Sequence, residues 1–411
     1  MDCLRAEMIK ALGCTEPIAI AYVSAKARKA LGCLPEQVVI SCSNNVIKNA
    51  KSVLIPMTDS MRGIDAACMV GVVGGNVEKK LEVLSDVGPE ELELAKKLLD
   101  QGVCEVRPLQ SGTNLHIRVE AFADGHSAMA ELMQTHLGIT RIVKDGEVLF
   151  EDKSIATKDA VNYDCLSIDN IFDFAMEAKL EDVAPLMDEQ MKCNFAIAEE
   201  GLRGNYGANV GKTLMELGGE DVRIRARAMA AAGSDARMNG CDMPVVINSG
   251  SGNQGITLTL PVMVYAEHLG CGYEKTVRAL TFSNLMAMYL KHGMGRLSAF
   301  CGAVSAAAGA GAAITYLYGG TRKQIEDTVT NTFANVSGII CDGANSSCAA
   351  KISTAVDAAI LGGIMALCGR VVEPGEGIVK DSLQQTTEGI IEIGRDGMQD
   401  TDRVVLEVML K

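Results

Sequence analysis

The sequence has no tryptophan, and aromatic side chains make up only 4% of its 411 residues. The hydrophobic core must therefore be filled by Ala, Val, Leu, Ile and Met, while 42 glycines allow close contacts between helices. Histidine is scarce, with five residues, and no two of them have the spacing of metal ligands. The chain also lacks an H-E-x-x-H motif, a C-x-x-C pair and an apparent Ser–His–Asp arrangement. These absences leave cysteines and polar loops as the main candidates for chemistry.

A basic surface is lacking too. The formal net charge of −14 argues against nucleic acid, and against an anionic membrane, as the main partner. Charges interrupt the apolar run of the first 14 residues, which predicts neither a signal peptide nor a membrane anchor. The uncharged stretch 297–320 is mostly Ala and Gly and predicts a buried helix. With no secretory leader, the 14 cysteines should be reduced thiols in a cytoplasmic protein.

The periodicity of apolar residues predicts an α+β fold, with a small α/β-mixed N-terminal domain and a larger all-α domain packed through Ala/Gly-rich helices. We expect the α+β domain over 35–160, ending in a polar joint at 151–158, and the all-α domain over 168–411. Residues 1–34 should form helices that pack on the all-α domain. This packing would bring Cys14 to a polar loop of that domain.

Local patterns give the individual elements. Period-two alternation predicts strands, and Asp145-Gly146 is a strong hairpin signal. Apolar residues at helical spacing, bounded by glycine, predict helices. The expected strands are 38–43, 51–56, 103–108, 114–122 and the hairpin 141–150, with further strand character in 388–394 and 403–410. The expected early helices are 2–12, 15–31, 63–75 and 89–101.

Two polar stretches lie between apolar segments of the helical half. The first, AAGSDARMNG over 231–240, contains Asp235 and Arg237. The second, VVINSGSGNQGIT over 245–257, leads into a helix near Gly255. The free backbone N–H groups at the start of that helix could bind a carboxylate. Its neutral hydrogen-bonding side chains are Asn248, Ser249, Ser251 and Asn253. The alternative is a plain interhelical turn. The G-x-G-x-x-G spacing at 250, 252 and 255 lacks a βαβ context, so a dinucleotide site is not expected.

The stretch IICDGANSSCAAKIST, over 339–354, places Cys341 and Cys348 around a turn-forming loop. Ser346 or Ser347 can cap a helix that begins at Cys348, and the dipole of that helix would lower the pKa of the thiol. Together with Cys301, these thiols could hold three irons of a [4Fe–4S] cluster and leave one iron open. The alternative is that they are small buried hydrophobic residues.

A fourth cysteine, Cys14, stands in the motif GCTEP at the start of the second helix. Thr15 can cap that helix, and Glu16 and Pro17 suit its first turn. Capping explains those three residues but not Cys14, whose pKa the helix dipole should lower.

The motifs ALGCTEP, SDARMNG, INSGSGNQGI and CDGANSSCAAK, in this order, resemble the L-cysteine desulfidase family, relatives of the iron–sulfur L-serine dehydratases. Similarity to the dehydratases is confined to the helical half. The resemblance implies that Cys301, Cys341 and Cys348 ligate a [4Fe–4S] cluster and that Cys14 is a ligand or an acid/base. It also makes Lys351 a candidate catalytic residue, although it lies one place further from the second cysteine than in the dehydratases.

The resemblance further implies β-elimination, in which L-cysteine and water give pyruvate, ammonia and sulfide without pyridoxal phosphate. Two alternatives remain at this stage. One is an iron–sulfur L-serine dehydratase, because serine fits the same carboxylate loop. The other is an iron–sulfur or thiol sensor without turnover. The expected partner is a small amino acid, with neither nucleic acid nor membrane, and a homo-oligomer is compatible with the sequence.

Overall fold

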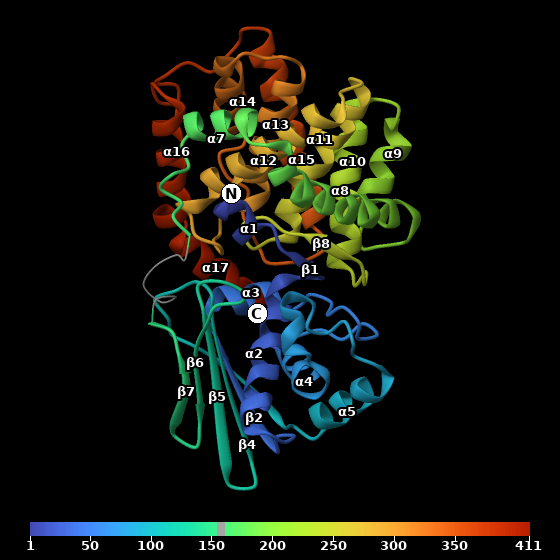
Figure 1. The fold of residues 1–411 in the computed structure, drawn as a ribbon, viewed down its shortest axis with the longest axis vertical. Coiled ribbons are helices and arrows are strands. Elements are labelled where there is room, and N and C mark those ends of the chain that lie inside the picture. The colour runs from blue at the N-terminus through green and yellow to red at the C-terminus, as the bar shows by residue number, and fades with distance from the viewer. Residues whose placement is uncertain (154–160) are drawn as a thin grey trace.

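A computed structural model describes residues 1–153 and 161–411 of the protein. The chain forms a small lobe with a β-sheet and a larger helical lobe. Figure 1 shows the small lobe at the bottom and the helical lobe at the top. The α+β fold predicted from the sequence is confirmed. The predicted joint at 151–158 falls largely on 154–160, outside the described residues.

The small lobe is built on a six-stranded sheet with the order β3-β2-β4-β5-β6-β7. β2 and β3 are parallel and the remaining neighbours are antiparallel. Two of its features confirm the sequence patterns: the hairpin β6–β7, and the helices α4 and α5. The strands are β2 (Gln37–Cys42), β3 (Cys104–Pro108), β4 (His116–Ala123), β5 (His126–Met133), β6 (Ile139–Lys144) and β7 (Glu147–Glu151). The helices of this lobe are α2 (Thr15–Leu31), α3 (Asn44–Ala50), α4 (Ile64–Gly74), the 3₁₀ helix η1 (Val77–Glu82) and α5 (Pro89–Asp100).

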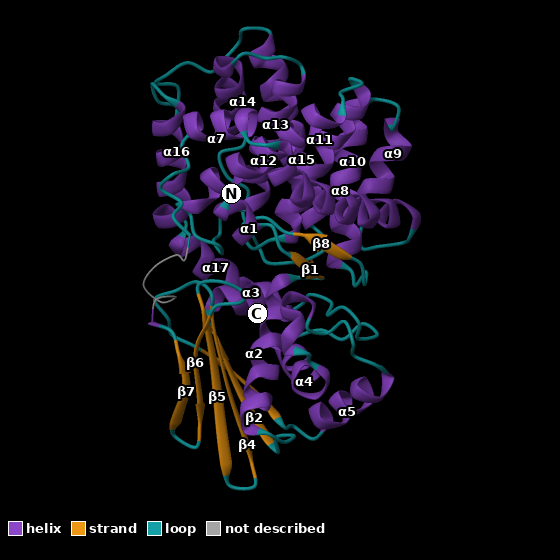
Figure 2. Cartoon of the chain, in the orientation of Figure 1, coloured by secondary structure: helices purple, strands orange, loops and turns teal. Residues whose placement is uncertain are grey.

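The large lobe is a set of closely packed helices, and Figure 2 shows almost no strand in it. Small residues at the crossings make the packing close. A Cβ on Gly201 would lie 2.0 Å from the carbonyl oxygen of Ala232, so α8 and α10 are in backbone contact there. The helices are α1 (Asp2–Glu7), α7 (Ile168–Glu177), α8 (Leu180–Arg203), α9 (Val210–Gly218), α10 (Val222–Met238), α11 (Gly252–His268), α12 (Tyr273–His292), α13 (Gly302–Leu317), α14 (Arg322–Asn335), α15 (Cys348–Leu367), α16 (Leu383–Glu392), the π-helical turn η2 (Ile393–Gly397) and α17 (Gln399–Leu410).

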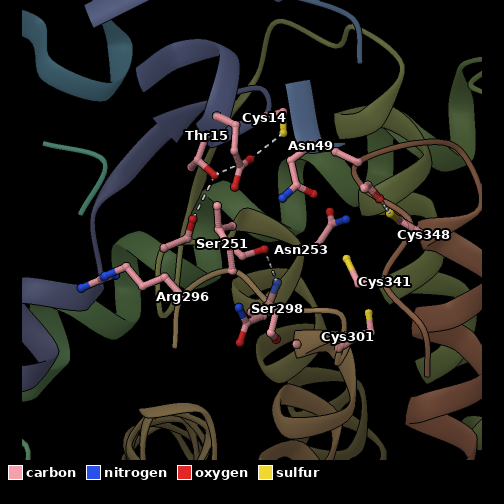
Figure 3. A pocket seen from close by; sticks show the side chains of 18 of the residues that line it. Cys14, Thr15, Asn49, Ser251, Asn253, Arg296, Ser298, Cys301, Cys341 and Cys348 are labelled. Carbon is pink, nitrogen blue, oxygen red and sulfur yellow. Dashed lines mark hydrogen bonds between the residues drawn. The ribbon is translucent and has the colours of Figure 1, made fainter. Parts of the chain in front are cut away.

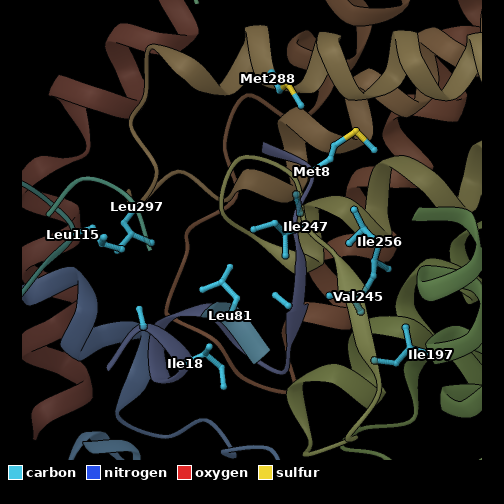
Figure 4. Packing of buried hydrophobic residues seen from close by; sticks show 14 of the residues in the cluster. Met8, Ile18, Leu81, Leu115, Ile197, Val245, Ile247, Ile256, Met288 and Leu297 are labelled. Carbon is cyan, nitrogen blue, oxygen red and sulfur yellow. The ribbon is translucent and has the colours of Figure 1, made fainter. Parts of the chain in front are cut away.

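The two lobes share one hydrophobic cluster. The short strand β1 (Lys10–Leu12) pairs antiparallel with β8 (Pro244–Val246) of the large lobe. Figure 4 shows side chains from both lobes meeting around this pair, among them Ile18, Leu81, Ile247 and Leu297. At the other side of the junction, Lys48 of α3 pairs with Asp402 of α17. The β1–β8 pairing and the Lys48–Asp402 ion pair therefore hold the two lobes together at two separate places.

Several sequence-based predictions differ from the structure. The first helix ends at Glu7, because residues 10–12 pair with β8 instead. Residues 51–56 form no strand: they follow the end of α3 at Ala50, and within them only Leu54 makes an isolated bridge, to Arg62. The tail segments 388–394 and 403–410 are helical, since Ile390 and Leu406 are buried on one helix face. Of the N-terminal helices predicted to pack on the helical domain, α1 contacts α12 of that domain, whereas α2 packs against the sheet and α4 of the small lobe.

Within residues 1–153 and 161–411, one helix, α15, is long and apolar enough to span a membrane by length and composition, but 56% of its apolar window is buried inside the protein. It packs between α10, α13 and α14. The apolar stretch 297–320 likewise contains the buried helix α13, as predicted. Both are core helices of the large lobe.

Candidate active site

A cavity with about 710 Å³ of empty space lies where the two lobes meet. Its wall comes from the N-terminus of α2, from α3, from the end of α10 and the start of α11, and from the segments around residues 291–303 and 341–352. Figure 3 shows Cys301 and Cys341 on one side of this cavity and Cys14 on the opposite side. Four of the cysteines singled out from the sequence, Cys14, Cys301, Cys341 and Cys348, line it.

Cys301 and Cys341 are held side by side by backbone pairing. The Cys301 N–H donates to the Ile339 carbonyl at 2.9 Å, and the Cys341 N–H donates to the Ala299 carbonyl at 2.7 Å. The neighbouring Cys301 thiol and the charge of Lys48 lower the pKa of Cys341 to about 6, whereas Cys341 and burial raise the pKa of Cys301. Residues 40 positions apart are thus adjacent in space.

Cys348 is the first residue of α15, as the sequence predicted. Its thiol donates to the Gly343 carbonyl at 3.6 Å. Neither predicted serine caps the helix, because Ser346 donates to Asn239 and Ser347 donates to Asn345. Burial raises the pKa of Cys348 to about 11, so the predicted lowering by the helix dipole is wrong for this environment.

These three thiols share one cavity, but they do not form a compact single-ion site. Across 1–153 and 161–411, no group of three or more His, Cys, Asp or Glu side chains has the arrangement needed to hold one metal ion. A [4Fe–4S] cluster distributes its cysteine ligands over separate irons, which is a different geometric requirement.

Cys14 occupies the N-cap position of α2, and its thiol donates to Glu16 Oε2 at 3.1 Å. Burial and the charge of Glu16 raise the pKa of Cys14 well above its ordinary value, so the predicted lowering by the helix dipole is wrong here too. Thr15 does not cap the helix, because its hydroxyl donates to the Gly250 carbonyl at 2.9 Å. Burial alone would raise the pKa of Glu16, but His136, Cys14 and Arg237 bring it to about 2.

The polar loop is a tight turn. The N–H of Asn248 donates to the Ser251 carbonyl at 3.1 Å and the N–H of Ser251 donates to the Asn248 carbonyl at 2.9 Å, while Ser249 has a positive φ of 49°. Ser251 caps α11 by accepting the Gln254 N–H at 3.4 Å. The side chain of Asn248 points away from the cavity and donates to the Oδ1 of Asn284 at 3.0 Å. Ser249 lines a neighbouring cavity, whereas Ser251 and Asn253 line the cavity described above.

Only one of the three charged candidates, Arg237, lines the cavity; Asp235 and Lys351 do not. Arg237 lines the cavity and donates through Nη1 to Asn253 Oδ1 at 3.1 Å. Asp235 is not part of the lining: it accepts the Gly211 N–H at 2.9 Å, at the start of α9. Lys351 is also outside the lining and pairs with Asp342 in the cysteine loop.

The cavity wall carries one buried donor and one buried acceptor without a hydrogen-bond partner in the protein. They are Nε of Arg237 and Oε1 of Gln254. Gln254 belongs to the first turn of α11, whose N-terminus faces the cavity. Because buried polar atoms are normally satisfied, these two atoms are candidates to bind a polar ligand.

Sequence reasoning missed several residues of this region. The sequence pattern gives Glu16 only a place in the first turn of a helix, Gln254 lies in the polar loop without standing out from it, and Asn49 and Lys291 belong to no motif. Lys291 is buried, which lowers its pKa to about 8, and it donates to Ser298 at 3.0 Å. His136 carried a weak signal as one of only five histidines.

Comparison with known proteins connects this site to a family. The sequence model of the serine dehydratase alpha chain matches residues 78–407, well over half of the chain. The match makes the protein, with its α+β fold, a lyase-type enzyme of the kind used in amino-acid catabolism. The chain belongs to the serine dehydratase alpha chain family, and the resemblance inferred from the motifs is confirmed. The match begins in the small lobe, so the similarity is not confined to the helical half as predicted.

Three bacterial relatives match along almost their whole length, and each is named a UPF0597 protein. The chain is 54% identical to the protein of Lachnoclostridium phytofermentans, with 100% of this chain and 99% of the relative covered. Identity is 46% to the Desulfitobacterium hafniense protein, with 100% and 96% covered, and 44% to the Treponema denticola protein, with 99% and 96% covered.

Proposed function

We propose that the protein is an iron–sulfur lyase that converts L-cysteine and water to pyruvate, ammonia and sulfide. The main support is the pair of unpartnered atoms on the cavity wall, Nε of Arg237 and Oε1 of Gln254. An α-amino acid carries a carboxylate that needs a donor and an ammonium group that needs an acceptor. The pair offers one of each in the same cavity as the thiols.

Cys301, Cys341 and Cys348 would hold a [4Fe–4S] cluster. The donor set fits, because three soft thiol ligands line one cavity and Cys341 has a lowered pKa that favours the thiolate. Such a cluster supplies an open iron that acts as a Lewis acid toward the substrate. In this proposal Lys351 stabilises the ligand loop through its ion pair with Asp342.

The protein groups recognise the carboxylate of the substrate at the start of α11. Nε of Arg237 donates to it, and the positive end of the α11 dipole favours the negative charge. Ser251 and Asn253 contribute by fixing this turn: Ser251 caps the helix, and Asn253 holds the guanidinium by accepting from Nη1. Asn248 and Ser249 act indirectly, by anchoring the loop to α12.

Cys14 is the proposed acid/base. It lies across the cavity from Cys301 and Cys341, and its proton already has a defined acceptor in Glu16. In its thiolate form Cys14 takes the proton from Cα, and the thiol that results has Glu16 Oε2 as its hydrogen-bond acceptor. A catalytic base must reach the substrate within hydrogen-bond distance, and Cys14 lies on the wall of the cavity proposed to hold it.

L-Serine is the alternative substrate, and the family name favours it. The test is pyruvate release from L-cysteine and from L-serine by anaerobically reconstituted protein, without added pyridoxal phosphate. The proposal requires turnover of L-cysteine at a higher kcat/KM than L-serine. Faster turnover of serine would make the protein a serine dehydratase. Full iron content without turnover of either would make it a sensor. All 14 cysteines are free, in keeping with a cytoplasmic location.

A further inference from the structure

The carboxylate of Glu16 is buried between two side chains that come from distant parts of the sequence. Its Oε2 accepts the thiol of Cys14 at 3.1 Å, and its Oε1 lies 3.4 Å from Nε2 of His136. Glu16 and His136 are only 7% and 4% exposed. A buried carboxylate is costly unless it is paired, so His136 is the partner that allows Glu16 to stay charged beside the thiol.

His136 is fixed by the turn between β5 and β6. The N–H of Met133 donates to the Gly138 carbonyl at 2.9 Å, and the N–H of Gly138 donates to the Thr135 carbonyl at 3.0 Å. The imidazole lies directly below the polar loop, because a Cβ on Gly250 would be 2.9 Å from Cε1 of His136. Thr15 holds the carbonyl of the same glycine. Thr15 and His136 of the small lobe therefore both contact the polar loop at Gly250.

The pair also separates two cavities. Glu16 lines the cavity with the thiols, whereas His136 lines a second one, with about 630 Å³ of empty space, on the other side. Other charged groups near the pair are Arg237, on the side of the thiols, and Arg296, which donates to Glu7 at 2.7 and 2.9 Å. The Thr15 hydroxyl also contacts Glu16 Oε2, at 3.3 Å, so Cys14, Thr15 and His136 together set the direction of the carboxylate.

We propose that Glu16 and His136 are a positioning pair, which holds the proton of Cys14 in line for exchange with the substrate. The inference rests on the proposed lyase function. In this arrangement Glu16 acts on the thiol, and His136 acts on Glu16. The role resembles that of the third member of a catalytic triad, which orients the group that moves the proton.

The test uses full-length, anaerobically reconstituted protein and four variants. His136→Leu removes the partner of Glu16, and His136→Gln keeps an N–H donor. Glu16→Gln removes the charge with little change of shape. His116→Leu is the matched control, because His116 pairs with Glu131 at 3.0 Å on the same sheet but is not part of the lining of the thiol cavity.

We expect His136→Leu and Glu16→Gln to lower kcat for L-cysteine about ten- to a hundredfold, the loss expected for a charge-assisted hydrogen bond. KM and iron content should stay near the wild-type values. His136→Gln should recover most of kcat, and His116→Leu should retain it. A wild-type kcat in His136→Leu would overturn the proposal. So would equal losses in His136→Gln and His136→Leu, or a change confined to KM.

A second readout needs no turnover. The infrared S–H stretching band of Cys14, obtained as the difference between wild type and Cys14→Ser, reports the strength of its hydrogen bond. Glu16→Gln and His136→Leu should both move this band to higher frequency. An unmoved band would refute the positioning pair even if the enzyme is active. A shifted band in a protein that turns over neither amino acid would support the pair and reject the lyase function.

Discussion

Replacing Arg237 by lysine tests how the cavity recognises its substrate. Arg237 is 3% exposed, its Nη1 is held by Asn253, and its Nε has no partner in the protein. Lysine keeps a positive charge near Glu16 and Cys14 but loses the planar fork and the Nε donor. The substitution therefore removes the proposed contact with the substrate carboxylate without leaving Glu16 uncompensated.

The expected magnitude follows from the lost contact. A hydrogen bond to a charged group contributes about 1.5–3 kcal/mol, which corresponds to roughly a 10- to 150-fold rise in KM for L-cysteine. L-Alanine has the same carboxylate and ammonium group but no leaving group. Its inhibition constant should rise by a similar factor, which separates recognition from chemistry.

The assay is pyruvate release under anaerobic conditions, with iron and sulfide measured on the same preparations. Arg227→Lys is the control, because Arg227 lies on the same helix but pairs with Asp357 at 3.4 Å, away from the cavity lining. It should leave KM unchanged. An unchanged KM and an unchanged inhibition constant in Arg237→Lys would refute the assignment of Arg237 to the carboxylate.

Four further outcomes are expected. Serine in place of each of the three cluster cysteines should abolish the brown chromophore of anaerobic preparations, and full iron and sulfide in all three variants would reject the ligand assignment. Cys14→Ser should keep its iron and lose at least about a hundredfold in turnover, as expected for a lost acid/base; iron loss would show that Cys14 is a ligand. Asn248→Ala should lower the free energy of unfolding by about 1–3 kcal/mol, because it breaks a buried amide network, and denaturant titration measures this; a rise in KM at unchanged stability would contradict its anchoring role. Burial raises the pKa of Asp235 to about 6, above the value near 3.9 of an unfolded chain, so its ionisation destabilises the native state increasingly from about pH 4 to pH 6 and fully above that range. Asp235→Asn should therefore raise Tm more at pH 7 than at pH 4.5, and an equal change at both pH values would contradict this reasoning.

Short-range patterns in the sequence were sufficient for part of this fold. The Asp145-Gly146 turn, the helices α4 and α5, and the start of α15 at Cys348 were all predicted, because each depends on neighbouring residues. The cysteine motifs also pointed to the residues that line the cavity. Local propensity predicted strands at 51–56 and in the two C-terminal segments, and these predictions were wrong. The conformation there depends on tertiary contacts, which local propensity does not include.

The environment of each site residue was decided by the tertiary structure alone. Both Cys14 and Cys348 stand at helix N-termini, and the sequence therefore predicted lowered pKa values. Burial and the charge of Glu16 outweigh the helix dipole at Cys14, and burial does so at Cys348. Likewise, no local signal connects His136 to Glu16, because the two residues are 120 positions apart. Residue type and spacing are properties of the chain, whereas desolvation and pairing depend on which distant segments the fold places around a group.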